Sequence, residues 1–282
     1  MFGPQFEMLR GKRWVMGYLF VLLAVAMAVS ALGWIYFIYF FSIGYGFGIA
    51  ALAVTIATMF YGELTLPTAL ICMVLFVFGC RLGAYLLTRE KKSASYRKIL
   101  YGPDASRKKN FGVVIVVWVF CALLYVGQVS PVVFYLANAS AGEDVSHAAA
   151  WVGMALMIAG VLLEATADMQ KAEAKAKRPD RFVDRGLYKI VRCPNYLGEL
   201  VIWTGSFVLC FGAHCTLWQW LIAAMGYAGI IYVMFSGARR LELRQNQVYG
   251  ENPDYIAYVK KTPLLIPLVP LYSLAKCEWL KA

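Results

Sequence analysis

Four places in this sequence set ionisable side chains inside or beside strongly apolar stretches, where they could do chemistry. In "VLLEATADMQKAEAKAKR", Glu164 and Asp168 are four residues apart, so they share one face of a predicted helix that Lys175 continues. Charged groups at membrane depth are costly, and they are functional candidates by default. A helix leaving the membrane, with its acids paired to its own lysines, would also explain Asp168. It explains Glu164 less well, because a full turn of apolar residues precedes it.

The second place is "RFVDRGLYKIVRCPNYLGEL", where helix breakers are followed by a predicted helix that starts near Asn195. Free amides at a helix start favour an anion, and guanidinium groups nearby would strengthen a phosphate site. Three such groups are close in the sequence: Arg181, Arg185 and Arg192. An ordinary helix cap followed by an acid that the helix dipole favours is the structural alternative. It accounts for Asn195 but poorly for Glu199, which already points into an apolar run.

The third and fourth places also lie near predicted helix ends. Arg81 lies about two turns inside the apolar segment "FVFGCRLGAYLLTRE" with Tyr85 on the same face, although snorkelling to the membrane boundary would also accommodate it. Arg240 and Arg244 are four apart in "GARRLELRQNQVYGENPDYIAYVKKTP". A cytoplasmic tail would explain the charge of that stretch but not its tyrosine spacing. Together the four places predict one polar cavity that opens to the cytosol and suits a large anionic cofactor.

The elements that must position these residues are membrane helices. The chain has 282 residues, of which 61% are hydrophobic and 15% charged, and its mean hydropathy is +0.63, values typical of a polytopic membrane protein. Seven apolar windows are long enough to cross a bilayer: residues 14–38, 42–62, 68–88, 111–136, 148–170, 196–213 and 216–238. We therefore predict an all-α fold of about seven transmembrane helices around a cofactor cavity, in a single membrane domain over residues 1–282.

The placement of lysine and arginine predicts the orientation. These residues are dense at 89–109, at 171–192 and after Arg239, and they are absent from "ANASAGEDVSHAAA" and "GAHCT". The positive-inside rule therefore predicts a cytoplasmic C-terminus, in a bacterial inner membrane or the endoplasmic reticulum. Seven spans would place the N-terminus outside, which Arg10, Lys12 and Arg13 oppose, and six spans would remove that conflict.

Charge and cysteine usage narrow the partners. The net charge of +11 collects beside membrane segments, so anionic lipids or a phosphorylated cofactor are expected rather than nucleic acid. Seven cysteines without a C-x-x-C pair, and only two histidines, predict neither a disulfide framework nor a metal site.

The order of three motifs resembles the C-terminal half of the steroid 5α-reductase family. These are "LEATADMQ", "GLYKIVRCPNYLGE" and "RRLELRQNQVYGENPDYIAYVKKTPLLIP", which cover roughly residues 150–270, with a weaker match at "RLGAYLLTRE". Family members are seven-helix membrane enzymes that use NADPH to reduce a carbon–carbon double bond conjugated to a ketone. The resemblance implies a cofactor-binding half at 148–270, substrate-side helices at 14–136, and a lipophilic enone such as a 3-oxo-Δ4-steroid as substrate.

The resemblance also implies roles for individual residues. Three would face the adenosine part of the cofactor: Glu164, Asp168 and Lys175, although the family has asparagine and arginine at the first and last of these positions. Others would line the ribose, phosphate and nicotinamide path: Arg181, Arg192, Asn195, Tyr196 and Glu199. Arg240 and Arg244 would close over the cofactor from the tail.

The substrate side departs from the family. Phe78 stands where the animal enzymes carry a tyrosine three residues before the arginine equivalent to Arg81, and the Gln-Glu-Leu-Pro stretch of those enzymes is absent. We therefore expect Arg81 to stabilise the enolate by charge and Tyr85 to deliver the proton. An interfacial anchor is the alternative role of Tyr85.

Two other functions stay open. Membrane methyltransferases of isoprenylcysteine or phospholipids carry Arg-His-Pro-x-Tyr-x-Gly, from which "RCPNYLG" differs at Cys193. Their paired glutamates after the last helix bind S-adenosylmethionine, whereas this chain has Glu242 alone, which favours the reductase. A lipid-binding membrane protein without enzymatic activity would explain the spans but not the acids within them.

Overall fold

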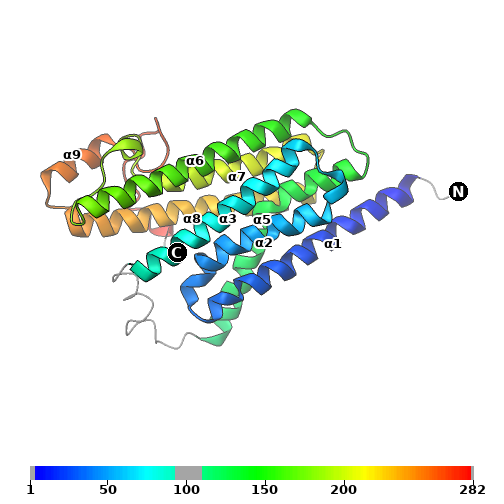
Figure 1. Cartoon of the computed structure of the whole chain (residues 1–282), viewed down its shortest axis with the longest axis horizontal. Helices are drawn as coiled ribbons and strands as arrows, with labels where there is room; N and C mark the ends of the chain where they lie inside the picture. Colours follow the sequence, from blue (N-terminus) through cyan, green and yellow to red (C-terminus); the bar gives the residue numbers. More distant parts are fainter. Residues whose placement is uncertain (1–3, 93–109, 281–282) are drawn as a thin grey trace. The chain divides into compact units, whose positions relative to one another are not determined.

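The computed structural model describes residues 4–92 and 110–280, and their regular structure is helical (Figure 1). The helices of the described part are α1 (Pro4–Ser30), α2 (Ile43–Met59), α3 (Leu66–Lys92), α5 (Phe111–Ser140), α6 (His147–Lys177), α7 (Pro194–Gly212), α8 (Leu217–Tyr249) and α9 (Pro253–Lys261). No strand occurs among these residues. The prediction of an all-α fold is confirmed.

Each of the seven predicted windows contains a helix, and five helical stretches of the described chain are long and apolar enough to cross a membrane. These are Val15–Trp34, Leu66–Arg89, Phe111–Ser140, His147–Lys177 and Leu217–Tyr249. Helix α2 is apolar but has 17 residues, and the 19-residue α7, which carries Asn195 and Glu199, is not among the five. The chain is therefore a polytopic membrane protein, and the full count of seven spans stays a prediction.

Two helices continue well beyond their apolar windows. Helix α6 extends to Lys177 and α8 to Tyr249, past the predicted ends at residues 170 and 238. The added turns are rich in Ala, Lys, Glu, Gln and Arg, which are strong helix formers and need no apolar surroundings. The polar extension of α6 borders the candidate site.

The chain divides into two compact units. The first unit comprises residues 1–154 and 206–227, and the second comprises residues 155–205 and 228–282. In the first unit α2 packs against α3, and α1 packs against α2 and α5. Small residues permit this packing, because a Cβ added to Gly79 of α3 would lie 2.5 Å from the Gly46 carbonyl oxygen of α2.

In the second unit, α6, α7 and α8 lie side by side (Figure 1). Gly160 and Gly198 let the α6 and α7 backbones touch, since a Cβ on Gly198 would come within 2.7 Å of the Glu164 amide nitrogen. Gly237 of α8 faces the ring of Tyr196, whose nearest atom would be 3.2 Å from an added Cβ. A loop over residues 178–193 joins α6 to α7, and α9 with an irregular C-terminal segment follows α8.

Candidate functional site

Three carboxylates are buried where α6 and α7 cross. Glu164 is 3% exposed, and Asp168 and Glu199 are each 6% exposed. The close approach of the two backbones places Glu164 beside Gly198, and Glu199 is the next residue of α7. Glu164 and Glu199, which the sequence places within apolar runs, are buried. Asp168 is buried as well, although the sequence also allowed it to lie at the membrane interface. The role of the three acids in binding a ligand stays a prediction.

The loop that follows α6 is fixed to this helix at Gly186. That residue has φ +60°, a conformation that favours glycine, and an added Cβ would lie 2.3 Å from the Gln170 Oε1 atom. The same Oε1 accepts a hydrogen bond from the Leu187 amide at 2.9 Å. Tyr188 is buried, and its hydroxyl donates to the Ala167 carbonyl at 3.3 Å. The loop is thus held at two successive turns of α6.

Lys175 holds the start of the same loop. Its Nζ donates to the carbonyl oxygens of Pro179 at 3.0 Å and Arg181 at 2.7 Å, and to the Tyr249 hydroxyl at 2.9 Å. An ammonium group has three hydrogens, so these three acceptors occupy all of its donors. In this arrangement Lys175 joins α6, the loop and the end of α8.

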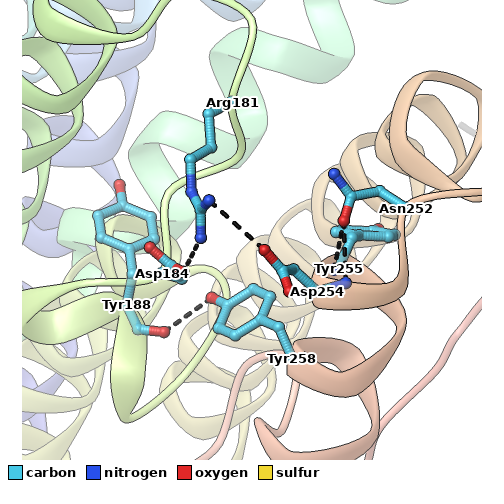
Figure 2. Close-up of polar contacts among 7 residues, drawn as sticks. All are labelled: Arg181, Asp184, Tyr188, Asn252, Asp254, Tyr255 and Tyr258. Carbon is cyan, nitrogen blue, oxygen red and sulfur yellow. Dashed lines mark hydrogen bonds and ion pairs between the residues drawn. The ribbon is translucent and has the colours of Figure 1, made fainter.

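Arg181 is the central cation of the loop (Figure 2). Its guanidinium donates to Asp184 Oδ2 at 3.0 Å, lies 3.6 Å from Asp254 Oδ2 of α9 and packs on the Phe182 ring at 5.1 Å. The hydrogen bond and charge of Asp184 raise the pKa of Arg181 above its ordinary value. The side chain therefore stays cationic and links the loop to α9.

Tyr258 makes a second link between the loop and α9. Its hydroxyl donates to the Tyr188 carbonyl at 2.7 Å, as Figure 2 shows, and its ring stacks on Phe182 with the centroids 5.4 Å apart. Burial raises the pKa of Tyr258, so the hydroxyl keeps its proton for this bond. The tyrosine spacing noted in the sequence is explained here, since Tyr249 and Tyr255 also surround Phe182.

A cavity of about 410 Å³ lies between the end of α6 and this loop. Its lining comprises Gln170, Glu173, Ala174, Lys177, Arg178, Arg181, Phe182, Val183, Asp184, Arg185 and Gly186. Four lining side chains are cationic and two are acidic. The volume falls in the range typical of small-molecule sites, and the excess of cations favours an anionic ligand.

Two of the four cations have no acidic partner in the described part of the chain. Lys177 pairs with Glu173 at 2.5 Å and Arg181 pairs with Asp184, whereas Arg178 and Arg185 have no ion pair among the described residues. Free guanidinium groups bind phosphate through two parallel hydrogen bonds. The donor set of the cavity therefore fits a phosphorylated ligand.

Arg192 has a different environment from these surface cations. Its side chain is 1% exposed, and its Nη2 donates to Glu242 Oε1 at 3.2 Å and to the Tyr272 carbonyl. The amides of Arg192 and Cys193 donate to the carbonyls of Pro263 and Leu264 at 2.9 and 3.0 Å. These amides and Arg192 Nη2, which precede α7 and were candidates for binding a phosphate, therefore have protein partners. Arg192 Nε and Nη1 have none among the described residues.

Burial around Arg192 also affects Cys193. Burial of the Cys193 thiol raises its pKa to about 12, although the positive charges of Lys171 and Arg192 oppose the shift. This thiol occupies the position of the histidine in the methyltransferase motif, and in its neutral form it is a poor nucleophile.

The remaining predicted residues lie in varied surroundings. Asn195 and Tyr196 are half-buried at the start of α7, and Arg240 and Arg244 are exposed on α8. Arg81 and Tyr85 are half-buried on α3 in the first unit, below the fully buried Phe78. No contact observed in the described part of the chain tests the catalytic roles assigned to Arg81 and Tyr85, so these roles stay predictions.

Sequence reasoning missed several residues of this region. Arg178 lines the cavity, Gln170 holds the loop, and Arg239 rather than Arg240 is the buried arginine of α8. Arg178 follows a run of lysines and offered no distinct signal. Glu242 was noted as a single acid, and its isolation among leucines was a sign of burial.

Metal-ligating residues do not gather in the region that the structure describes. No group of three or more His, Cys, Asp or Glu side chains could hold a metal ion there.

Comparison with known proteins gives one curated relative and one family. The chain is 25% identical over 179 residues to a protein of Dictyostelium discoideum named very-long-chain enoyl-CoA reductase. That alignment covers 63% of this chain and 55% of the relative, so the chain spans about half of the relative's length. No solved structure matches the chain significantly. The profile of a protein family, in contrast, matches residues 39–262, well over half of the chain. The chain belongs to this family, DUF1295, which is described as a family of proteins of unknown function and includes steroid 5α-reductase-like proteins.

Proposed function

We propose that this protein is a membrane-bound, NADPH-dependent reductase of a carbon–carbon double bond conjugated to a carbonyl in a lipophilic substrate. The observation that carries the proposal is the cavity beside the end of α6, where Arg178 and Arg185 lack acidic partners among the described residues. A ligand with several phosphate charges suits it. The reductase name of the Dictyostelium relative and the steroid 5α-reductase-like members of the family support the same reaction class.

Arg178 and Arg185 would hold phosphate groups of the cofactor in the cavity. The acids of the α6–α7 crossing, Glu164, Asp168 and Glu199, would accept hydrogen bonds from its hydroxyl and amide groups. Four further side chains belong to the proposed site: Asn195, Tyr196, Arg240 and Arg244.

Three cations proposed from the sequence would act mainly through the scaffold. Lys175 and Arg181 hold the loop that lines the cavity, and Arg192 holds the C-terminal segment. Their replacement would therefore weaken cofactor binding by displacing the loop or the start of α7.

The proposed chemistry adds a hydride and a proton across the double bond. NADPH supplies the hydride when bound. Negative charge then develops on the substrate carbonyl oxygen, and a cation or hydroxyl aimed at that oxygen lowers the barrier. Arg81 would stabilise this charge and Tyr85 would deliver the proton, as expected from their spacing on α3.

The substrate belongs to one of two lipophilic classes in this proposal. A 3-oxo-Δ4-steroid follows from the sequence resemblance, and a long-chain enoyl thioester follows from the name of the Dictyostelium relative. Both have a double bond conjugated to a carbonyl, so both suit the same hydride and proton transfer. Oxidation of NADPH by the purified protein, followed with a panel of steroid enones and acyl thioesters, separates them.

A methyltransferase is the second candidate, and the three buried carboxylates favour it. S-adenosylmethionine carries a positively charged sulfonium, which buried acids would attract. Glu242, however, has both carboxylate oxygens engaged, one by Arg192 and the other by the Leu274 amide at 2.8 Å. It is therefore not free to bind a ligand in the way of the paired glutamates of that family.

Thermal stabilisation of the detergent-solubilised protein by NADPH, NADH and S-adenosylmethionine tests the proposal. We expect NADPH to raise the melting temperature most, since it has one phosphate more than NADH. Arg178→Ala with Arg185→Ala should weaken NADPH binding roughly tenfold, because two exposed charge-assisted contacts are lost. Lys260→Ala, which removes an exposed charge from α9, is the matched control and should leave the affinity unchanged.

Two outcomes would contradict the proposal. Stabilisation by S-adenosylmethionine without any by NADPH would favour the methyltransferase. Equal NADPH affinity in the double variant and the Lys260→Ala control would remove the cavity from the cofactor site, even if the protein proved to be a reductase.

A further inference from the structure

The C-terminal segment over residues 263–280 runs back along α8 toward the apolar part of that helix. The Leu274 amide donates to Glu242, Arg239 donates to the Ala275 carbonyl at 3.2 Å, and the Tyr232 hydroxyl donates to the Trp279 carbonyl at 3.3 Å. Later residues of the segment thus meet earlier residues of α8. Glu242 and Tyr232 are ten residues apart, which is about 15 Å along a helix axis.

Buried charged side chains satisfy the backbone of this segment. Arg192, Arg239 and Glu242 are each less than 9% exposed, and each binds a peptide group of the segment. Irregular backbone at membrane depth is tolerated only where its amides and carbonyls have partners, because lipid offers none. These three side chains supply such partners to the segment.

Several outward side chains of the same segment are apolar, although Ser273, Lys276 and Glu278 are exposed as well. Leu268 is 100% exposed and Trp279 is 70% exposed, and Val269 and Tyr272 are also on the surface. Leu268 has φ +63° in the turn "IPLVP", a conformation that costs a leucine energy. Exposed apolar side chains beside a membrane-crossing helix are typical of contact with lipid.

The level of Trp279 along α8 indicates what surrounds its side chain. Trp279 packs on Tyr232, with the ring centroids 6.5 Å apart, and Tyr232 lies in the apolar part of a helix that meets the criteria for crossing a membrane. A bilayer that α8 crosses at this level would therefore surround the exposed face of Trp279 as well. Tryptophan is enriched at the boundary between acyl chains and headgroups.

We propose that residues 263–280 form a membrane-inserted segment that places Leu268 and Trp279 in the leaflet on the C-terminal side of the bilayer. The occupant of this apolar surface is the boundary between lipid headgroups and acyl chains. Exposed lysines lie just before the segment, at Lys260 and Lys261, and within it at Lys276, and they suit anionic headgroups. The proposal concerns attachment to the bilayer and is independent of the proposed reaction.

Site-specific photocrosslinking in vesicles of phosphatidylethanolamine and phosphatidylglycerol tests this proposal. Leu268 and Trp279 are replaced, one at a time, by p-benzoylphenylalanine in the full chain, and intact-protein mass spectrometry detects covalent lipid adducts after illumination. Glu251, exposed in the turn between α8 and α9, is the control position. We expect phospholipid adducts at 268 and 279 and at least tenfold fewer at 251.

Two results would overturn the proposal. One is the absence of lipid adducts at 268 or at 279, and the other is crosslinking of these positions mainly to a second copy of the chain or to another protein. The role of the buried charged side chains in holding the segment has its own test. Glu242→Ala frees the Leu274 amide and should lower the adduct yield at 279 several-fold. An unchanged yield would contradict the role of the buried charges in holding the segment.

Discussion

The buried ion pair of Arg192 and Glu242 should be the most sensitive polar contact of the second unit. Its two side chains are 1% and 2% exposed, and Nη2 lies 3.2 Å from Oε1. Glu242→Ala removes the carboxylate and leaves a buried cation whose described acceptor is the Tyr272 carbonyl alone. Breaking a buried pair in this way costs about 3–5 kcal/mol, and the freed Leu274 amide adds about 1–3 kcal/mol.

A double variant measures the coupling energy between Arg192 and Glu242. Arg192→Met with Glu242→Met removes both charges, so only the backbone groups of Tyr272 and Leu274 lose their partners. We expect this variant to be no less stable than either single variant, Arg192→Met or Glu242→Met, with a coupling energy of roughly 2–3 kcal/mol between the two positions. Additive losses would refute the interpretation that each charge is tolerated because of the other.

Unfolding by sodium dodecyl sulfate in mixed micelles, followed by circular dichroism, measures these changes in the free energy of unfolding. Glu173→Ala is the control, because Glu173 and Lys177 are closer together, at 2.5 Å, but are exposed to solvent. Solvent screening makes such pairs weak, and we expect no measurable loss there. A larger effect in the control than in Glu242→Ala would show that distance rather than burial governs these pairs.

Three further changes test the loop and the start of α7. Lys175→Met should loosen the loop that begins at residue 178, because three acceptors lose their donor. In the presence of NADPH, proteolysis of this loop should then begin at a lower temperature than in the unaltered protein, and an equal temperature would contradict this. Gly186→Ala should destabilise the protein by about 1–2 kcal/mol, since φ +60° disfavours alanine, and thermal unfolding measures the loss. Cys193, whose pKa is about 12, should resist iodoacetamide at pH 9 in the folded protein while Cys277 reacts. The thiol is neutral when folded but ionises near its ordinary pKa when unfolded, so its contribution to stability should be lost as pH rises from about 9 to 12.

The helices were predictable because apolar windows of membrane length are a local signal. Their ends were less so, since the polar turns of α6 and α8 continue the helix without apolar residues. Burial of Glu164 and Glu199 also followed from the sequence, because apolar residues precede or follow each of them. Asp168 is near the end of its apolar window, so the sequence did not decide between burial and the membrane interface. Local pattern therefore predicted the helices and two of the three buried acids.

Partners distant in the sequence could not be predicted in this way. Arg192 meets a residue 50 positions later, and Lys175 meets one 74 positions later. Arg239 and Arg240 are neighbours in the chain, but successive helical residues point about 100° apart, so only one of them faces inward. The sequence alone does not show which of the two arginines faces inward, and the packing of the C-terminal segment determines which one is buried.

The charged residues of the second unit therefore have two different functions in the structure. Those with buried side chains, such as Arg192 and Glu242, bind backbone groups of the irregular C-terminal segment. Those at the cavity, Arg178 and Arg185, are exposed and have no acidic partner among the described residues. Substitution of the first group should lower stability whether or not a ligand is present, whereas substitution of the second should change ligand affinity alone. Burial by itself thus identifies a constrained residue, and an available donor is needed before that residue is assigned to a ligand.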